Sequence, residues 1–85
     1  MSRNITIENW MAKQLGLNGN SLVLFAIIWR ESKQGQDMFI DNYADHSAAM
    51  NTSIPTYYNT LGKLVTKGLL RKVDGGYTVE VKRAA

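Results

Sequence analysis

Apolar residues recur along the first third of the chain at the spacing of helices. Around residues 7–15 they fall three or four positions apart, which places them on one helical face, and Gly16 follows as a C-cap. A second helix is predicted from Asn18, a good N-cap, to about Lys33, where the polar turn QGQD ends it. Every position of 22–29 is apolar, so this helix should be covered on all sides.

The middle of the chain predicts a short strand and a third helix. Residues 38–40, Met-Phe-Ile, are β-prone and lie between polar turns, which suits an edge strand that pairs with a later hairpin. A helix follows, with Asp41 or Asn42 as its cap, and runs to about Met50 with Tyr43 and Met50 facing inward.

The rest of the chain is organised around residues 51–70. Thr52 and Ser53 offer capping hydroxyls, and Pro55 suits a first helical turn, where its missing N–H costs little. Gly68 ends the helix. One face is apolar: Tyr57, Leu61, Leu64 and Val65. A short helix behind a tight turn, with a polar outer face, is typical of the helix-turn-helix element that enters a DNA groove.

A β-hairpin is predicted directly after this helix. Residues 77–82 alternate between apolar and polar side chains, which is the pattern of a half-buried strand. They are separated from 70–73 by Asp74-Gly75-Gly76, and Asp-Gly or Gly-Gly between two such runs is a strong hairpin signal. Pairing with 38–40 would make a short three-stranded sheet.

Length and composition indicate one small domain over residues 1–85. The apolar share of 45% is ordinary for a globular protein. The absence of cysteine excludes disulfides and thiolate metal sites. The chain starts without an apolar run of signal-peptide length, and its longest apolar run, eight residues, is far below the roughly 20 of a membrane span, so we expect a cytoplasmic protein.

Positive charge gathers in the second part of the chain. Residues 1–51 carry four basic and five acidic residues, whereas residues 52–85 carry six basic and two acidic residues. The net charge of +3 therefore comes from the stretch that holds the fourth helix and the hairpin. Such an asymmetry is expected of a phosphate-facing surface, with an ordinary solvated surface as the alternative.

Several short motifs resemble bacterial winged helix-turn-helix domains. Residues 47–50, Ser-Ala-Ala-Met, match the small-residue helix before the turn, and 53–56, Ser-Ile-Pro-Thr, match the Ser-x-x-Thr start of the recognition helix. Leu61 and Leu64 match its spaced leucines, and 67–70, Lys-Gly-Leu-Leu, match its Lys-Gly-Leu-Ile-like exit. The resemblance covers nearly the whole chain. It implies a mainly α fold with a small β-hairpin wing (α+β) that binds double-stranded DNA.

A narrower resemblance lies in residues 15–29, LGLNGNSLVLFAIIW, followed by a glycine turn and 38–40. This arrangement is similar to the N-terminal DNA-binding module of phage and plasmid replication initiators, or replisome organisers, of low-GC bacteria. The chain departs from the general pattern at His46, where leucine is usual, and at Asn51, where glycine is usual. Residues 54–56 also lack the Arg, Lys, Asn or Gln that usually read base edges.

We expect about four helices, a helix-turn-helix at about 41–67 and a wing at about 69–82. The fourth helix, 53–67, would enter the major groove, and the basic wing would lie on the DNA backbone. The candidate DNA-binding residues are Thr52, Ser53, Pro55, Thr56, Tyr58, Asn59, Lys63, Lys67, Arg71, Lys72 and Lys82.

These residues would divide the work of binding. The Asn59 amide can bond bidentately to adenine, and Tyr58 could touch a thymine methyl or a phosphate. The cationic side chains would make non-specific phosphate contacts. For Thr52 and Ser53 a purely structural capping role is an equal alternative.

Enzymatic signatures are missing from the sequence. It contains no glycine-rich phosphate loop, nucleophile elbow or zinc spacing, so we expect no enzyme, cofactor or metal. His46 is the only histidine and is interpreted as a packing residue. Asp41 and Asp45 lie one helical turn apart, but acidic residues at a helix start have an electrostatic reason to be there.

The sequence is compatible with two functions. The first is a DNA-binding protein, either a phage or mobile-element transcriptional regulator or a replication-initiation module. The second is a protein–protein interaction adaptor with a winged-helix fold. A homodimer through the apolar helix 18–33 is a further hypothesis.

Overall fold

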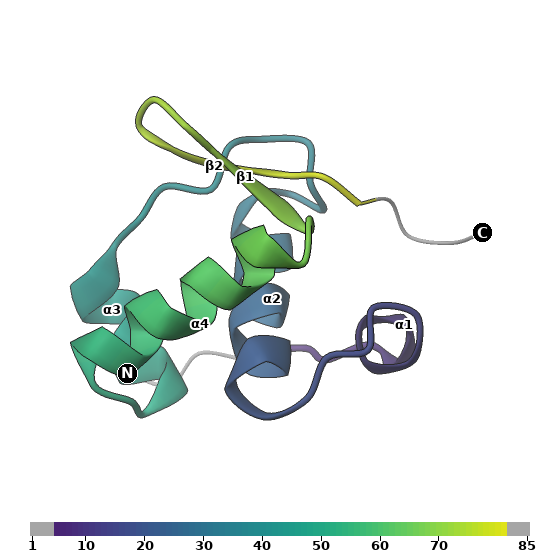
Figure 1. Cartoon of the computed structure of the whole chain (residues 1–85), viewed down its shortest axis with the longest axis horizontal. Coiled ribbons are helices and arrows are strands. Elements are labelled where there is room, and N and C mark those ends of the chain that lie inside the picture. The colour runs from purple at the N-terminus through teal and green to yellow at the C-terminus, as the bar shows by residue number, and fades with distance from the viewer. Residues whose placement is uncertain (1–4, 82–85) are drawn as a thin grey trace.

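Four helices followed by one antiparallel strand pair make up residues 5–81, the part of the chain that the computed structural model describes (Figure 1). The elements in chain order are α1 (Asn9–Lys13), α2 (Gly19–Glu31), α3 (Tyr43–Met50), α4 (Ile54–Thr66), β1 (Leu70–Val73) and β2 (Gly76–Val79). The expected mainly helical α+β class is therefore confirmed. No described helix has the length and apolar character needed to cross a bilayer.

The caps of α3 and α4 follow the local sequence. Asn42 caps α3, because its side-chain oxygen accepts a hydrogen bond from the Asp45 N–H at 3.3 Å. Ser53 caps α4 by accepting from the Thr56 N–H at 3.2 Å. Gly68 ends α4 with a φ of 80°, the left-handed conformation that glycine adopts most readily.

The first two helices differ from the expectation at their ends. Helix α1 has only five residues, since it begins at Asn9 and not near residue 7. Ile7, predicted on its buried face, precedes the helix and is 47% exposed. Asn18 stands at the N-cap position of α2, as predicted, but its side chain makes no capping hydrogen bond.

A short reversal joins α3 to α4. Asn51 has a φ of 57°, a left-handed conformation that asparagine tolerates better than most residues, so it fills the place where glycine is usual. The next amide, of Thr52, donates to the Ser47 carbonyl at 3.0 Å and closes the end of α3. The reversal turns the chain so that α4 packs on both α3 and α2.

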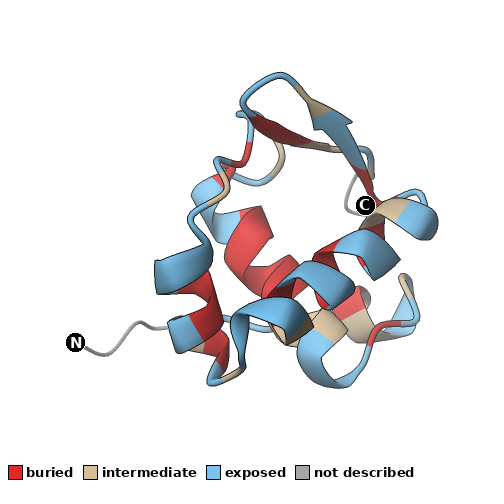
Figure 2. Ribbon diagram, turned by 60° about the vertical axis from the view of Figure 1, so that its left-hand side comes forward, coloured by how far each residue is buried: buried red, intermediate tan, exposed pale blue. Residues whose placement is uncertain are grey.

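The core lies between α2, α3 and α4, whose buried residues face one another (Figure 2). The predicted burial of the apolar run 22–29 holds for Leu24 to Trp29, which the chain's own elements bury, whereas Leu22 and Val23 are only partly buried. Trp10 of α1 packs edge-on against Phe25 and Trp29, with ring centroids 5.8 and 4.9 Å away. The chain's own elements therefore cover most of α2, and the homodimer through this helix stays a hypothesis.

The hairpin pairs Leu70 with Val79 and Val73 with Gly76. The predicted three-stranded sheet is not confirmed, because residues 38–40 pair with the hairpin through a single bridge, Phe39 to Tyr77, and the sheet has two strands. Both amides of that bridge donate to the opposite carbonyl, at 2.7 and 2.9 Å. After Phe39 the chain continues to the N-cap of α3, so no second backbone pair with the hairpin forms.

Candidate nucleic-acid interface

Helix α4 presents one buried face and one exposed face. The buried residues are Tyr57, Thr60, Leu61 and Leu64, while Val65 is partly buried. The exposed residues include Pro55, Asn59, Gly62, Lys63, Thr66 and Lys67. The structure thus brings Pro55, Asn59, Lys63 and Lys67 of the predicted DNA-binding residues together on the outer side of one helix.

The two hydroxyl groups directly before α4 differ in their contacts. The Ser53 hydroxyl donates to Thr56 Oγ1 at 3.0 Å while accepting from the Thr56 amide. The Thr52 Oγ1 atom is buried and has no hydrogen-bond partner in the described chain. Of the two capping candidates, Ser53 caps the helix and Thr52 does not.

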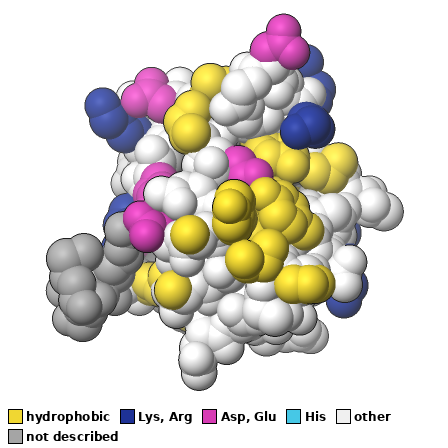
Figure 3. Space-filling view, turned by 90° about the vertical axis from the view of Figure 1, so that its left-hand side faces the viewer, with side chains coloured by type: hydrophobic (Ala, Val, Ile, Leu, Met, Phe, Trp, Pro, Cys, Tyr) yellow, Lys and Arg dark blue, Asp and Glu magenta, His cyan; other side chains and the backbone are white. Residues whose placement is uncertain are grey.

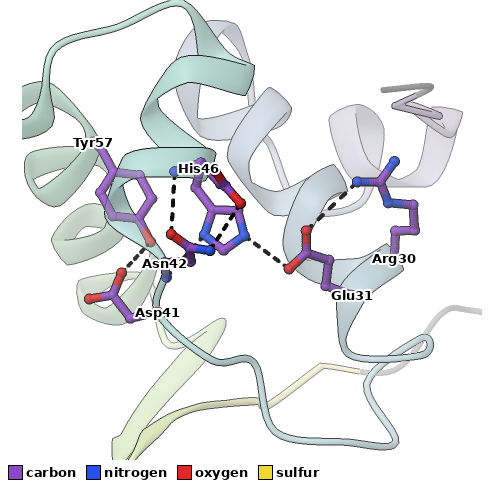
Figure 4. A network of polar contacts seen from close by, with 7 residues as sticks. Arg30, Glu31, Asp41, Asn42, His46 and Tyr57 are labelled. Atoms are coloured by element: carbon purple, nitrogen blue, oxygen red, sulfur yellow. Dashed lines mark hydrogen bonds and ion pairs between the residues drawn. The ribbon is translucent and has the colours of Figure 1, made fainter. Parts of the chain in front are cut away.

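Asp41 holds the two adjacent tyrosines of α4. Its carboxylate oxygens accept hydrogen bonds from Tyr57 at 2.8 Å and from Tyr58 at 2.9 Å (Figure 4 shows the Tyr57 contact). Burial, followed by this hydrogen bond, raises the pKa of Tyr57, and the hydrogen bond to Asp41 raises the pKa of Tyr58. The Tyr58 hydroxyl, predicted as a DNA contact, is therefore already engaged within the chain.

His46 is a buried member of a polar chain between α2 and α3 (Figure 4). Its Nδ1 accepts from the Asn42 amide at 3.3 Å, so Nε2 carries the proton and donates to Glu31 at 2.9 Å. Arg30 approaches the other Glu31 oxygen at 3.7 Å. The ring is 2% exposed and tilts against Phe39. These contacts agree with the packing role expected of this histidine.

A groove of about 760 Å³ separates α4 from the start of α2. Asn59, Lys63 and Lys67 line its α4 side, and Asn18 and Ser21 line its α2 side. None of the acidic residues within 5–81 lines it. Both lysines are exposed and form no ion pair with the described residues, so their charge is available to a polyanion.

The positive charge of the hairpin is partly compensated. Arg71 Nε lies 3.5 Å from an oxygen of Glu80, the residue that follows β2, and Lys72 Nζ lies 5.0 Å from the centre of the Tyr77 ring. Lys82, the other predicted wing contact, lies outside the described residues. Within the described hairpin Lys72 is the cation without an acidic partner.

The opposite flank of α4 is apolar. Its large exposed side chains are Ile40, Tyr43, Ile54 and Tyr58, which we call the apolar face. Tyr43 and Tyr58 lie 6.3 Å apart between ring centroids. Figure 3 shows hydrophobic side chains gathered here with acidic groups among them. The prediction that Tyr43 faces inward is wrong, because it is 50% exposed in the first turn of α3.

Six residues that line the groove are not among the predicted DNA-binding residues: Gly16, Leu17, Asn18, Ser21, Gly62 and Thr66. Of these, Asn18 is predicted as a helix cap, Ser21 belongs to no recognisable motif, and Gly62 stands inside a strongly amphipathic helix. A glycine in the interior of a predicted helix is the signal that could have added Gly62 to the predicted residues Asn59, Lys63 and Lys67 on this side of α4.

Comparison with protein-family models, with curated proteins and with solved structures gave no match to this chain. Its function is therefore argued from the geometry of its own residues.

Proposed function

We propose that the chain is a winged-helix protein that binds double-stranded DNA. In this assignment α3 and α4 are the helix-turn-helix, α4 enters the major groove, and the β1–β2 hairpin is the wing. The order of elements supports it, with three packed helices, a short reversal before the last of them, and a hairpin that follows directly. A phage or mobile-element regulator, or a replication-initiation module, would use DNA in this way.

The unpaired cations of α4 carry the proposal. Lys63 and Lys67 are one turn apart and exposed on the same side of the helix as Asn59, with no acidic partner in the described chain. Lysines in this position neutralise phosphates, and an asparagine amide beside them can hydrogen-bond to an adenine edge. Asn59 is the one direct base reader among the exposed α4 residues that we propose, so modest sequence preference is expected.

Charge reversal tests this assignment. A labelled random duplex titrated by fluorescence anisotropy should bind the wild-type chain with an affinity that falls steeply with salt. The double variant K63E/K67E should lose at least about tenfold in affinity at low salt, because two phosphate contacts become repulsive.

A charge-matched control separates local contact from net charge. The variant K13E/K33E makes the same change in charge at two exposed lysines outside α4 and the groove. It should retain most of the affinity. Equal losses in both double variants, or no binding by the wild-type chain at low salt, would argue against the assignment.

The apolar face favours a second candidate function, a protein-interaction adaptor. Ile40, Tyr43, Ile54 and Tyr58 expose apolar surface around the Asp41 carboxylate, as interface cores often do. Under this reading the wild-type chain would not bind DNA. A partner complex would survive K63E/K67E and be lost in Y43S/I54S, which removes two exposed apolar side chains.

A further inference from the structure

The groove between α2 and α4 collects polar side chains that nothing in the described chain uses. The groove is lined by Asn18, Ser21, Asn59, Lys63 and Lys67, and none of these five side chains makes a hydrogen bond or ion pair with another described residue. Four of these five side chains, all but Ser21, are on exposed residues. A set of donors without an acidic residue among them suits an anionic ligand.

Gly62 lies in the same groove, in the middle of α4. It has no left-handed backbone, and a Cβ atom added there would meet nothing within 4 Å. The fold therefore gives no steric reason for a glycine, although glycine is the poorest helix former after proline. What it does provide is a place where another molecule can approach the helix backbone closely.

The two flanks of α4 differ in charge. The groove flank has Lys63 and Lys67, whereas the other flank has Asp41 in the segment before α3 and Asp45 in the first turn of α3, a helix without lysine or arginine. A helix in a major groove about 12 Å wide lies between two sugar-phosphate strands. A strand is attracted to the lysine flank and repelled by the carboxylates of the other.

We propose that the groove between α2 and α4 seats one sugar-phosphate strand of bound DNA, which passes against the α4 backbone at Gly62. Asn18 and Ser21 of α2 donate hydrogen bonds to its phosphates, opposite Lys63 and Lys67. This inference rests on the proposed function and adds to it a DNA contact from α2 and a reason for the glycine.

Adding a side chain at Gly62, one of the residues that line the groove, tests the proposal. The variant Gly62→Leu places a good helix former in open space, so its thermal midpoint should equal or exceed that of the wild-type chain. Its dissociation constant for the random duplex should nevertheless rise at least about tenfold, because the side chain occupies the path of the strand. Asn9→Leu, at an exposed position of α1 outside the helix-turn-helix and the groove, is the control and should leave affinity unchanged.

Removing the α2 donors gives an independent measurement. Asn18→Ala/Ser21→Ala should weaken binding several-fold while leaving the slope of log affinity against log salt unchanged, because neither side chain is charged. Wild-type affinity in both this variant and Gly62→Leu would overturn the groove proposal and leave DNA binding intact. Absence of binding by the wild-type chain would instead overturn the proposed function, and the groove assignment with it.

Discussion

At the scale of residues, Asp41 is the connection between the segment before α3 and the buried face of α4. Its two oxygens serve two different hydroxyls, one on the fully buried Tyr57 and one on the exposed Tyr58. The buried hydroxyl needs this partner, since an unpaired buried hydroxyl costs roughly 1–3 kcal/mol. The exposed hydroxyl could find water instead, so the Tyr57 contact is the one that matters for stability.

The raised pKa of Tyr57 leads us to expect that the folded chain loses stability at alkaline pH. Burial and the Asp41 hydrogen bond raise its folded-state pKa above the ordinary value of 10. Above pH 10 the phenol therefore ionises in the unfolded chain and stays protonated in the folded one. The stabilisation is complete below pH 10 and falls as the pH rises toward the folded-state pKa, by at most about 1.4 kcal/mol per pH unit.

Urea unfolding of the wild-type chain and Y57F between pH 8 and 11 measures this effect. Y57F should be less stable at pH 8, because it leaves Asp41 with one donor fewer, and the gap between the two proteins should narrow above pH 10. Parallel stability curves would show that Tyr57 does not titrate as proposed.

At the scale of elements, α3 and α4 are specified by short-range chemistry at their ends. Asn42 and Ser53 each accept from the amide three residues ahead, and Gly68 allows the Leu69 amide to reach back to the Leu64 carbonyl at 3.1 Å. Such contacts depend on neighbours in the chain. They position α4 before any partner binds.

Adjacent substitutions at the start of α4 should act in opposite ways. Ser53→Ala should lower the free energy of unfolding by about 1 kcal/mol, because the Thr56 amide loses its acceptor. Thr52→Val should be neutral or stabilising, since it replaces a buried hydroxyl that has no partner. Chemical denaturation of the two variants measures both changes in the free energy of unfolding. An equal loss of stability in both variants would contradict the assignment of Ser53 as the cap.

At the scale of the whole molecule, the proposed DNA binding would depend on which cations already have an acidic partner. Lys63 and Lys67 have no acidic partner in the described chain, whereas Arg71 faces Glu80 across the hairpin. The exposed Arg71–Glu80 pair contributes little to stability, but it lowers the positive potential of the wing. The groove side of α4 should therefore contribute more to DNA affinity than β1 does.

Salt dependence distinguishes the two contributions. Lys63→Ala should reduce the slope of log affinity against log salt by about 0.9, and Arg71→Ala should reduce it by clearly less. Glu80→Gln, which releases Arg71, should raise affinity at low salt. Equal slopes for Lys63→Ala and Arg71→Ala would show that the ion pair does not persist on DNA.

By itself the sequence determined the order of elements, the burial of most of α2 and the hairpin turn, and it limited each cap to two candidates, Asp41 or Asn42 for α3 and Thr52 or Ser53 for α4. These features follow from the identity of residues within one or two turns of each other, which a pattern contains completely. The face of α4 that bears Asn59, Lys63 and Lys67 was predictable for the same reason.

Only the tertiary structure decided which of these segments contact one another. The Glu31–His46 and Asp41–Tyr57 contacts join residues 15 and 16 positions apart, and the groove joins the start of α2 to the middle of α4. The third strand was reduced to one bridge, and Tyr43 was turned outward, by the path of the chain between helices. Such outcomes depend on packing between distant segments, and periodicity along the chain contains no record of it.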